Sequence, residues 1–297
     1  MHLEQIIEEA TRMPNRTVAV AASEDSEVIH AVKMAIDKGI ASFQLFGDED
    51  RTTALLNEHG LQQSDQLKVI PCQAPDESAA KAVQAVSSGN ADVVMKGMVS
   101  TSVILKAVLN KEFGLRTGKV LSHVAAFEID GFDRLIFVTD AAMNIAPDLK
   151  QKADIIQNAV DVARKLGVET PKVAPITAVE VVNPSMEATL DAAALSQMNS
   201  RGQIKDCIVD GPLALDNAVS LEAASHKGIS GEVAGQADIL LVPNIETGNA
   251  LYKSLIYFAR AKVGAVISGA KAPIVLTSRA DTAESKLNSI ALAVRSV

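Results

Sequence analysis

The chain has 297 residues, a formal net charge of −8 at pH 7 and a hydrophobic fraction of 48%, as expected for a soluble globular protein with a sizeable core. The acidic balance argues against a general nucleic-acid-binding protein but is compatible with a locally positive pocket for a small anion. The two cysteines, Cys72 and Cys207, lack metal-ligand spacing and indicate a reducing compartment without a disulfide framework.

The amino-terminal segment is amphipathic and carries several acidic residues. It lacks the basic region followed by an apolar stretch that is typical of a signal peptide. No apolar run approaches the length that a membrane span requires. We therefore expect a cytoplasmic protein.

Apolar strand runs alternate with amphipathic helix patterns in the first third of the chain. A helix is expected over residues 3–12, and a second helix is capped by Ser23 and ended by Gly39. The expected strands are Thr17–Ala22, Phe43–Phe46, Leu67–Ile70 and Ala91–Lys96. The further helices are Ala54–Glu58, Glu77–Val86 and Val103–Leu109.

A β-hairpin interrupts this alternation. The runs Val120–Glu128 and Arg134–Thr139 flank Asp130-Gly131, which is a strong hairpin signal. A long helix, Asp148–Leu166, follows the hairpin.

The alternation then resumes to the end of the chain. Strands are expected at Lys172–Thr177, Asp206–Val209, Asp238–Val242 and Ile274–Thr277, with helices at 185–198, 217–226, 248–261 and 282–296. Strands that are apolar throughout predict a mainly parallel sheet covered on both faces. Ligands of such sheets bind beyond the carboxyl ends of the strands.

The turn after the last strand is the strongest candidate for a phosphoryl-binding site. Ser278 supplies a hydroxyl and Arg279 a guanidinium fork, and Asp281 or Thr282 can cap the helix that begins near Ala283. We expect this turn to present free backbone N–H groups at the positive end of the helix dipole. The alternatives are a surface ion pair for Arg279 and a plain N-cap for Ser278.

Four other strand ends carry small or polar residues before a helix or turn, at 95–102, 137–144, 209–218 and 242–253. The candidate substrate-binding residues there are Lys96, Gly97, Ser100, Thr101, Asp140, Asp210, Asn244, Gly248, Asn249 and Lys253. Turn geometry alone could explain such loops; Asp140 and Asp210 could only cap turns, and Lys253 could be a charge on a solvated helix face. His123 lies in an apolar strand and is expected to be a packed core histidine. The glycine-rich stretches match neither a P-loop nor a dinucleotide fingerprint.

These turns, in this order, resemble a known family. G-M-V-S-T-S, D-G-P-L-A-L-D, P-N-I-E-T-G-N-A-L-Y-K and the final T-S-R look like the phosphate acetyl/butyryltransferase family, from about Asp92 to Arg279 and more loosely over the whole chain. The segment F-E-I-D-G-F-D-R-L-I-F-V-T-D-A-A-M-N-I-A-P-D is most similar to the butyryltransferase branch.

The resemblance implies two α/β/α domains with mainly parallel sheets around a cleft, an isocitrate-dehydrogenase-like fold. Domain I would comprise 1–118 and 268–297, domain II would comprise 119–267, and the active site would lie in the cleft. It also implies acyl transfer between coenzyme A, as a substrate, and phosphate, with no bound cofactor and no metal. A homo-oligomer is expected on the same ground.

By similarity, Ser278 and Arg279 match the family pair that contacts the acyl phosphate. The acetyltransferases place Gly after this pair and Asp six residues after the Arg; here Ala280 and Ser285 occupy those positions, and Glu284 is adjacent. Asp281 and Glu284 are therefore both candidate bases. Lys106 is the nearest match to a family arginine in the helix after the small-residue turn.

We expect butanoyl-CoA and phosphate to be interconverted with butanoyl phosphate and CoA in a ternary complex. The alternatives are an acetyl- or broad short-chain acyltransferase and a non-catalytic acyl-CoA-sensing domain. A dehydrogenase on the same fold should bring a nucleotide-binding signature and clustered metal carboxylates, and the sequence contains neither. Neither cysteine has a paired His, which argues against a thiol acyl-enzyme.

Overall fold

The chain forms two α/β units, of which the computed structural model describes residues 1–278 and 281–297. Unit 1 comprises Met1 and Val120–Lys262, and unit 2 comprises His2–Lys119 and Val263–Val297. The unit boundaries lie at residues 119/120 and 262/263, compared with 118/119 and 267/268 in the sequence-based prediction. The predicted α/β class with mainly parallel strands is confirmed.

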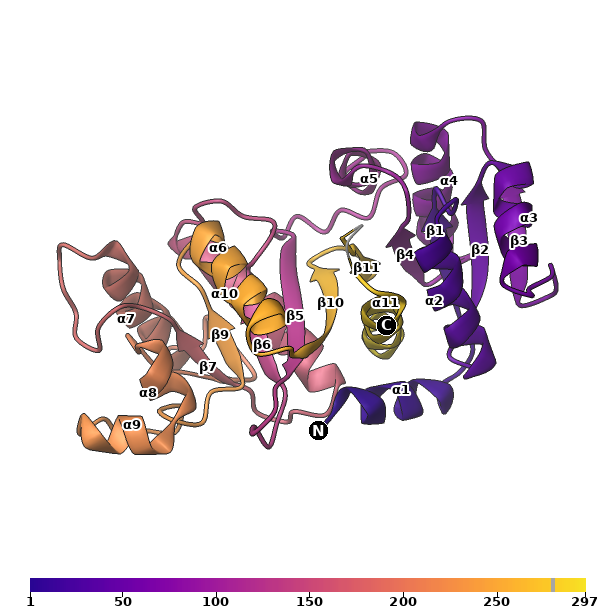
Figure 1. Cartoon of the computed structure of the whole chain (residues 1–297). Helices are drawn as coiled ribbons and strands as arrows, with labels where there is room; N and C mark the ends of the chain where they lie inside the picture. Colours follow the sequence, from indigo (N-terminus) through magenta and orange to yellow (C-terminus); the bar gives the residue numbers. More distant parts are fainter. Residues whose placement is uncertain (279–280) are drawn as a thin grey trace. The chain divides into compact units, whose positions relative to one another are not determined.

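Figure 1 labels the strands of unit 2, whose described pairings are parallel except for that of β10 with β11. Their order is β3-β2-β1-β4-β11-β10, and only β10 runs antiparallel to its neighbour β11 among these described pairings. The strands are β1 (Arg16–Ala21), β2 (Ala41–Gly47), β3 (Leu67–Pro71), β4 (Val93–Lys96), β10 (Lys262–Ser268) and β11 (Ile274–Val275). Strand order reverses between β1 and β4, which in open α/β sheets is where ligands bind.

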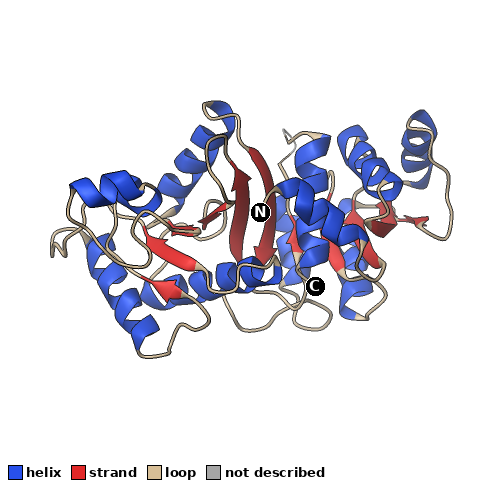
Figure 2. Cartoon of the chain, turned by 90° about the horizontal axis from the view of Figure 1, so that it is seen from below, coloured by secondary structure: helices blue, strands red, loops and turns tan. Residues whose placement is uncertain are grey.

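Helices lie on both sides of the unit 2 strands (Figure 2). One set packs around α11, and α4 packs against α5 and β1. The helices are α1 (Leu3–Thr11), α2 (Ser26–Asp37), α3 (Glu49–Glu58), α4 (Pro75–Ser87), α5 (Thr101–Val108) and α11 (Ala283–Arg295). The buried residues of β1 and β4 are almost all apolar, so this sheet forms the core of unit 2.

The strands of unit 1 follow one another in the order β5-β6-β9-β7-β8. The predicted hairpin is confirmed as the antiparallel pair β5 (Ser122–Glu128) and β6 (Ile136–Thr139), and Gly131 at its turn has φ 87°. The parallel strands are β7 (Lys172–Pro175), β8 (Ile208–Val209) and β9 (Ile239–Leu241). The helices are α6 (Leu149–Lys165), α7 (Glu187–Ser200), α8 (Leu215–Val219), α9 (Leu221–His226) and α10 (Ile245–Tyr257). None of the described helices of either unit is long and apolar enough to span a bilayer.

Several elements differ from their predictions; helix α2, for example, is capped by Asp25 and not by the predicted Ser23. Strand β10 was not predicted, because Gly264 interrupts its apolar pattern. A Cβ at this glycine would lie 2.9 Å from the backbone of Asn288 in α11, so the missing side chain permits close helix packing. The helix predicted over 217–226 is two helices, α8 and α9, separated at Ser220. Helix α3 begins at Glu49 rather than Ala54, because Asp48 caps it.

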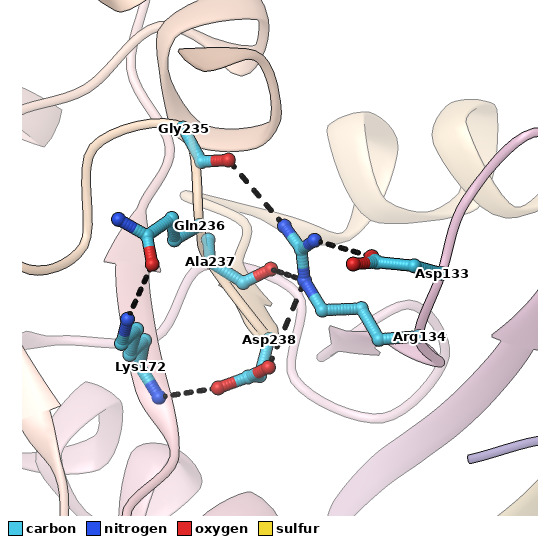
Figure 3. A network of polar contacts seen from close by, with 7 residues as sticks. All are labelled: Asp133, Arg134, Lys172, Gly235, Gln236, Ala237 and Asp238. Atoms are coloured by element: carbon cyan, nitrogen blue, oxygen red, sulfur yellow. Dashed lines mark hydrogen bonds and ion pairs between the residues drawn. The ribbon is translucent and has the colours of Figure 1, made fainter.

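A polar network joins the amino-terminal ends of β6, β7 and β9 (Figure 3). Arg134 Nε donates to the Ala237 carbonyl at 3.3 Å and lies 3.8 Å from Asp238 Oδ1. Asp238 Oδ2 accepts the backbone N–H of Lys172 at 2.9 Å. Burial raises the pKa of the Asp238 carboxyl, although the Lys172 N–H and the Arg134 charge oppose this shift.

This raised pKa predicts a pH-dependent stability. The stability that protonated Asp238 provides is fully present below the carboxyl's ordinary pKa of 3.8 and is lost as pH rises through the folded-state pKa. We expect Asp238→Asn to remove this contribution, so the unfolding free energy of the wild type should fall relative to that of the variant as pH rises above 3.8. Urea titrations across that range measure the difference. Asp50→Asn is the control, because Asp50 is exposed on α3 of unit 2, outside this network; an equal pH-dependent difference between the wild type and Asp50→Asn would contradict the prediction.

Candidate functional site

Two candidate groups lie at the exits of adjacent parallel strands in unit 2. Val275 of β11 pairs with Met95 of β4, so the residues that follow both strands meet at one edge of the sheet. Lys96 is buried there with 6% exposure. Its Nζ donates to the carbonyls of Gly97 and Val99, each at 3.1 Å. The ammonium is thereby fixed at the carboxyl edge, below the turn that leads to α5.

Gly97 is in close contact with the neighbouring strand exit. Its N–H donates to Ala21 at 2.8 Å, and the N–H of Met98 donates to the Ala22 carbonyl at 2.6 Å. A Cβ on Gly97 would lie 2.0 Å from the Ala22 carbonyl oxygen. Only glycine therefore fits this turn.

The start of α5 is capped by its own residues. Ser100 Oγ accepts the Val103 N–H at 3.3 Å and lies 3.0 Å from Ser102 Oγ. Thr101 and Lys106 are exposed on the helix. The structure thus places all three candidates of this helix at or near the surface, with Ser100 as the N-cap of α5.

The start of α11 is more fully engaged than the sequence predicted. Asp281 Oδ2 accepts the Ser278 N–H at 2.7 Å, and Thr282 caps the helix by accepting the Ser285 N–H at 3.2 Å. Glu27 of α2 accepts the Ala283 N–H at 3.0 Å. The expectation of free backbone N–H groups is therefore wrong for these three donors, because protein oxygens already bind them.

The other predicted residues of this turn have different environments. Glu284 is exposed, whereas Asp281 is half-buried. Arg279, the predicted phosphate ligand, lies outside the described residues, as does Ala280.

Two buried polar residues beside this turn were not predicted. Thr277 is 6% exposed, and its Oγ1 has no hydrogen-bond partner among the described residues. Lys286 of α11 is 2% exposed and donates from Nζ to the Asp281 carbonyl. Lys286 could not be singled out from the sequence, because a lysine in an amphipathic helix normally indicates a solvated face.

In unit 1, Asp140 follows β6 and its carboxylate is saturated by the turn. Oδ1 accepts the N–H groups of Ala142 and Met143 at 2.9 and 3.0 Å. Oδ2 accepts the backbone N–H of Asn144 at 3.2 Å and its side-chain amide at 2.6 Å. With four donors on a carboxylate that is 3% exposed, Asp140 shapes the turn.

The neighbouring exit, after β9, leads into α10. Asn244 caps this helix by accepting the Thr247 N–H at 3.0 Å. A Cβ on Gly248 would lie 2.7 Å from the Asp140 carbonyl, so glycine lets α10 approach the Asp140 turn. Asn249 and Lys253 are exposed, one helical turn apart. The structure therefore brings Asp140, Asn244 and Gly248 together.

Asp210 is separate from that group. It follows β8, which lies two strands from β9 in the unit 1 sheet. Asp210 Oδ2 faces Gly231, where a Cβ would lie only 2.9 Å away. This places Asp210 beside the loop that precedes β9.

An aromatic cluster accounts for His123. The residue is 6% exposed on β5, and its ring lies edge-on to Tyr252 of α10 with centroids 5.8 Å apart. Phe127 makes a similar contact with Tyr252 at 5.2 Å. The prediction of a packed core histidine is confirmed.

Neither cysteine has the character of a nucleophile. Burial raises the pKa of the Cys72 thiol. Burial, together with the charges of Asp206 and Asp161, raises the pKa of the Cys207 thiol to about 12. Thiolates would be scarce at neutral pH. Across residues 1–278 and 281–297, no three His, Cys, Asp or Glu side chains gather as metal ligands would.

Comparison with known proteins identifies the chain's relatives. The family described as phosphate acetyl/butaryl transferase matches residues 73–294. A protein of Bacillus subtilis (strain 168) named probable phosphate butyryltransferase is 60% identical over 294 residues, which are 99% of this chain and 97% of that protein. A phosphate butyryltransferase of Clostridium acetobutylicum is 54% identical over 97% of this chain and 96% of its own.

A solved structure supports the same grouping. The crystal structure of a branched-chain phosphotransacylase from Enterococcus faecalis V583 is 38% identical. It superposes with a TM-score of 0.83 and covers 95% of this chain and 98% of its own.

Proposed function

Because the chain belongs to the phosphate acetyl/butaryl transferase family, we propose that it transfers a butanoyl group directly between coenzyme A and phosphate in a ternary complex. The coarser activity, acyl transfer between acyl-CoA and phosphate, follows from the family and from relatives that align over nearly the whole chain. The butanoyl preference rests on the names of those two relatives. The observation that carries the proposal is the 60% identity over 99% of the chain.

The proposed reaction begins with phosphate bound by Arg279 and Ser278, at the carboxyl edge where Lys96 is buried. A phosphate oxygen attacks the thioester carbonyl carbon and forms a C–O bond. The tetrahedral intermediate then expels the CoA sulfur as the C–S bond breaks, giving butanoyl phosphate and CoA. The cations Arg279 and Lys96 would stabilise the oxyanion of the tetrahedral intermediate as it develops. Lys106 and the unit 1 candidates Asp140, Asp210, Asn244, Gly248, Asn249 and Lys253 are proposed to bind or shape the substrate site.

In the reverse direction the CoA thiol must lose its proton, and Asp281 and Glu284 are the candidate bases. Asp281 already accepts the Ser278 N–H at 2.7 Å, which supports a bracing role for this residue. Glu284 is exposed and adjacent to the same turn. We therefore propose Glu284 as the base.

Release of CoA from a series of thioesters tests this function. Acetyl-, butanoyl-, 2-methylpropanoyl- and octanoyl-CoA are incubated with and without phosphate, and free thiol is measured. Phosphate-dependent release that is fastest with butanoyl-CoA is expected. An acetyl optimum would instead identify a phosphate acetyltransferase, and a 2-methylpropanoyl optimum would indicate the branched-chain preference in the name of the E. faecalis structure. Binding of CoA without any release would favour a non-catalytic acyl-CoA-sensing domain.

Direct transfer predicts that both thiols are dispensable. The double variant Cys72→Ala/Cys207→Ala should retain kcat within about twofold, because the raised pKa values of both thiols disfavour the thiolate that would carry the acyl group. The measurement is the initial rate with butanoyl-CoA at saturating phosphate. Melting temperature is the control, because both residues are at least partly buried. A folded double variant that lost activity would instead indicate a covalent acyl-enzyme.

A further inference from the structure

Lys286 is a buried lysine with no charged partner among residues 1–278 and 281–297. It lies one turn inside α11 with 2% exposure, and its Nζ donates to the backbone carbonyl of Asp281. Among the described residues, no carboxylate lies within ion-pair distance of this ammonium. A buried cation with a neutral partner is costly to fold, which argues for a role beyond packing.

Lys152 shows the ordinary arrangement for a buried lysine in this protein. It is 6% exposed on α6, and its Nζ lies 2.5 Å from Asp191 Oδ2 of α7. That ion pair joins two helices of unit 1. Lys286 differs from Lys152, because its described side-chain hydrogen bond goes to the main-chain carbonyl of Asp281.

Asp281 connects Lys286 to Ser278; we call this chain of hydrogen bonds the tether. The Asp281 carboxylate accepts the Ser278 N–H at 2.7 Å, and the Asp281 N–H donates to the Ser278 carbonyl at 3.1 Å. Asp281 is therefore held on one side by Lys286 and binds Ser278 on the other. A change in the position of the Asp281 peptide would move Ser278 with it.

We propose that Lys286 is a positioning residue that, through the Asp281 carbonyl, fixes Ser278 for phosphate binding. This inference rests on the proposed function. Loss of the Lys286 ammonium should weaken phosphate binding, because the hydrogen bonds from Lys286 through Asp281 lead to Ser278. Butanoyl-CoA binding, which depends on many other groups, should be little affected.

Steady-state kinetics of Lys286→Met test the proposal, because methionine keeps an apolar stem without the ammonium. We expect the KM for phosphate to rise at least tenfold while the KM for butanoyl-CoA changes less than threefold. Lys286→Arg, which keeps the charge and a donor, should recover most of the phosphate affinity. The matched control is Asn288→Ala in the same helix, whose amide donates to the Val263 carbonyl at 3.3 Å on β10. This control should lower the melting temperature and leave the phosphate KM within twofold.

The outcomes distinguish failure of the positioning role of Lys286 from failure of the proposed function. An unchanged phosphate KM in Lys286→Met, or an equal rise in Asn288→Ala, would overturn the positioning role while the active wild type upholds the proposed function. Lack of phosphate-dependent release by the wild type would overturn both. If Lys286→Met does not fold, Asp281→Gly tests the same tether: it keeps the carbonyl that Lys286 binds and removes the carboxylate brace, so its phosphate KM should also rise. A phosphate KM in Asp281→Gly equal to that of the wild type would overturn the proposal.

Discussion

Replacing Arg279 with alanine is expected to lower kcat/KM for butanoyl-CoA phosphorolysis by roughly a hundred- to a thousandfold, the usual effect of removing one preorganised group that stabilises transition-state charge. In the proposed role, the Arg279 guanidinium neutralises the phosphate charge and donates two parallel hydrogen bonds, and alanine can do neither. Ser278 and Asp281, which bracket this residue in the sequence, are held to each other by two hydrogen bonds. The loss should therefore appear in kinetics, with little change in unfolding free energy.

Two further variants make the Arg279 result specific. Arg279→Lys keeps the charge but loses the planar fork, so an intermediate activity is expected. Arg201→Ala removes an exposed arginine after α7 in unit 1 and should leave the rate unchanged. Near-native turnover of Arg279→Ala at saturating phosphate would show that Arg279 does not bind the phosphate.

The strand exits could be predicted because local chemistry determines them. The apolar run of β4 ends at Lys96-Gly97, and Asp130-Gly131 encodes the hairpin turn through residues adjacent in sequence. Strand β10 could not be predicted in this way. Its Gly264 is explained by the close approach of Asn288, a tertiary contact that strand propensity does not contain.

The candidate site shows the same division. The sequence predicted that polar residues gather after β4 and β11, and pairing of these strands explains why they do. It could not predict that Glu27 would accept the Ala283 N–H, because 256 residues separate the two. Nor could it distinguish a brace from a base at Asp281, since that depends on whether the carboxylate already has a donor.

Gly97→Ala is expected to be the most destabilising single-methyl addition near the site, at about 3 kcal/mol, the upper range for overpacking. The added Cβ would lie 2.0 Å from the Ala22 carbonyl oxygen, a backbone atom that cannot rotate away. Relief requires the exits of β1 and β4 to separate, which breaks the hydrogen bonds from Gly97 to Ala21 and from Met98 to Ala22. Because Lys96 lies at the same turn, activity should fall together with stability.

Urea denaturation and phosphate-dependent CoA release, measured on the same samples, test this coupling. Gly39→Ala is the control: its φ of 73° makes alanine strained, but no atom lies within 4 Å of the added Cβ. That variant should lose about 1 to 2 kcal/mol from backbone strain alone and retain its specific activity in the folded fraction. If Gly97→Ala were no less stable than Gly39→Ala, the β1 and β4 exits would have to separate at little cost. The carboxyl ends of β1 and β4 would then be too flexible to hold Lys96 in one position for phosphate binding.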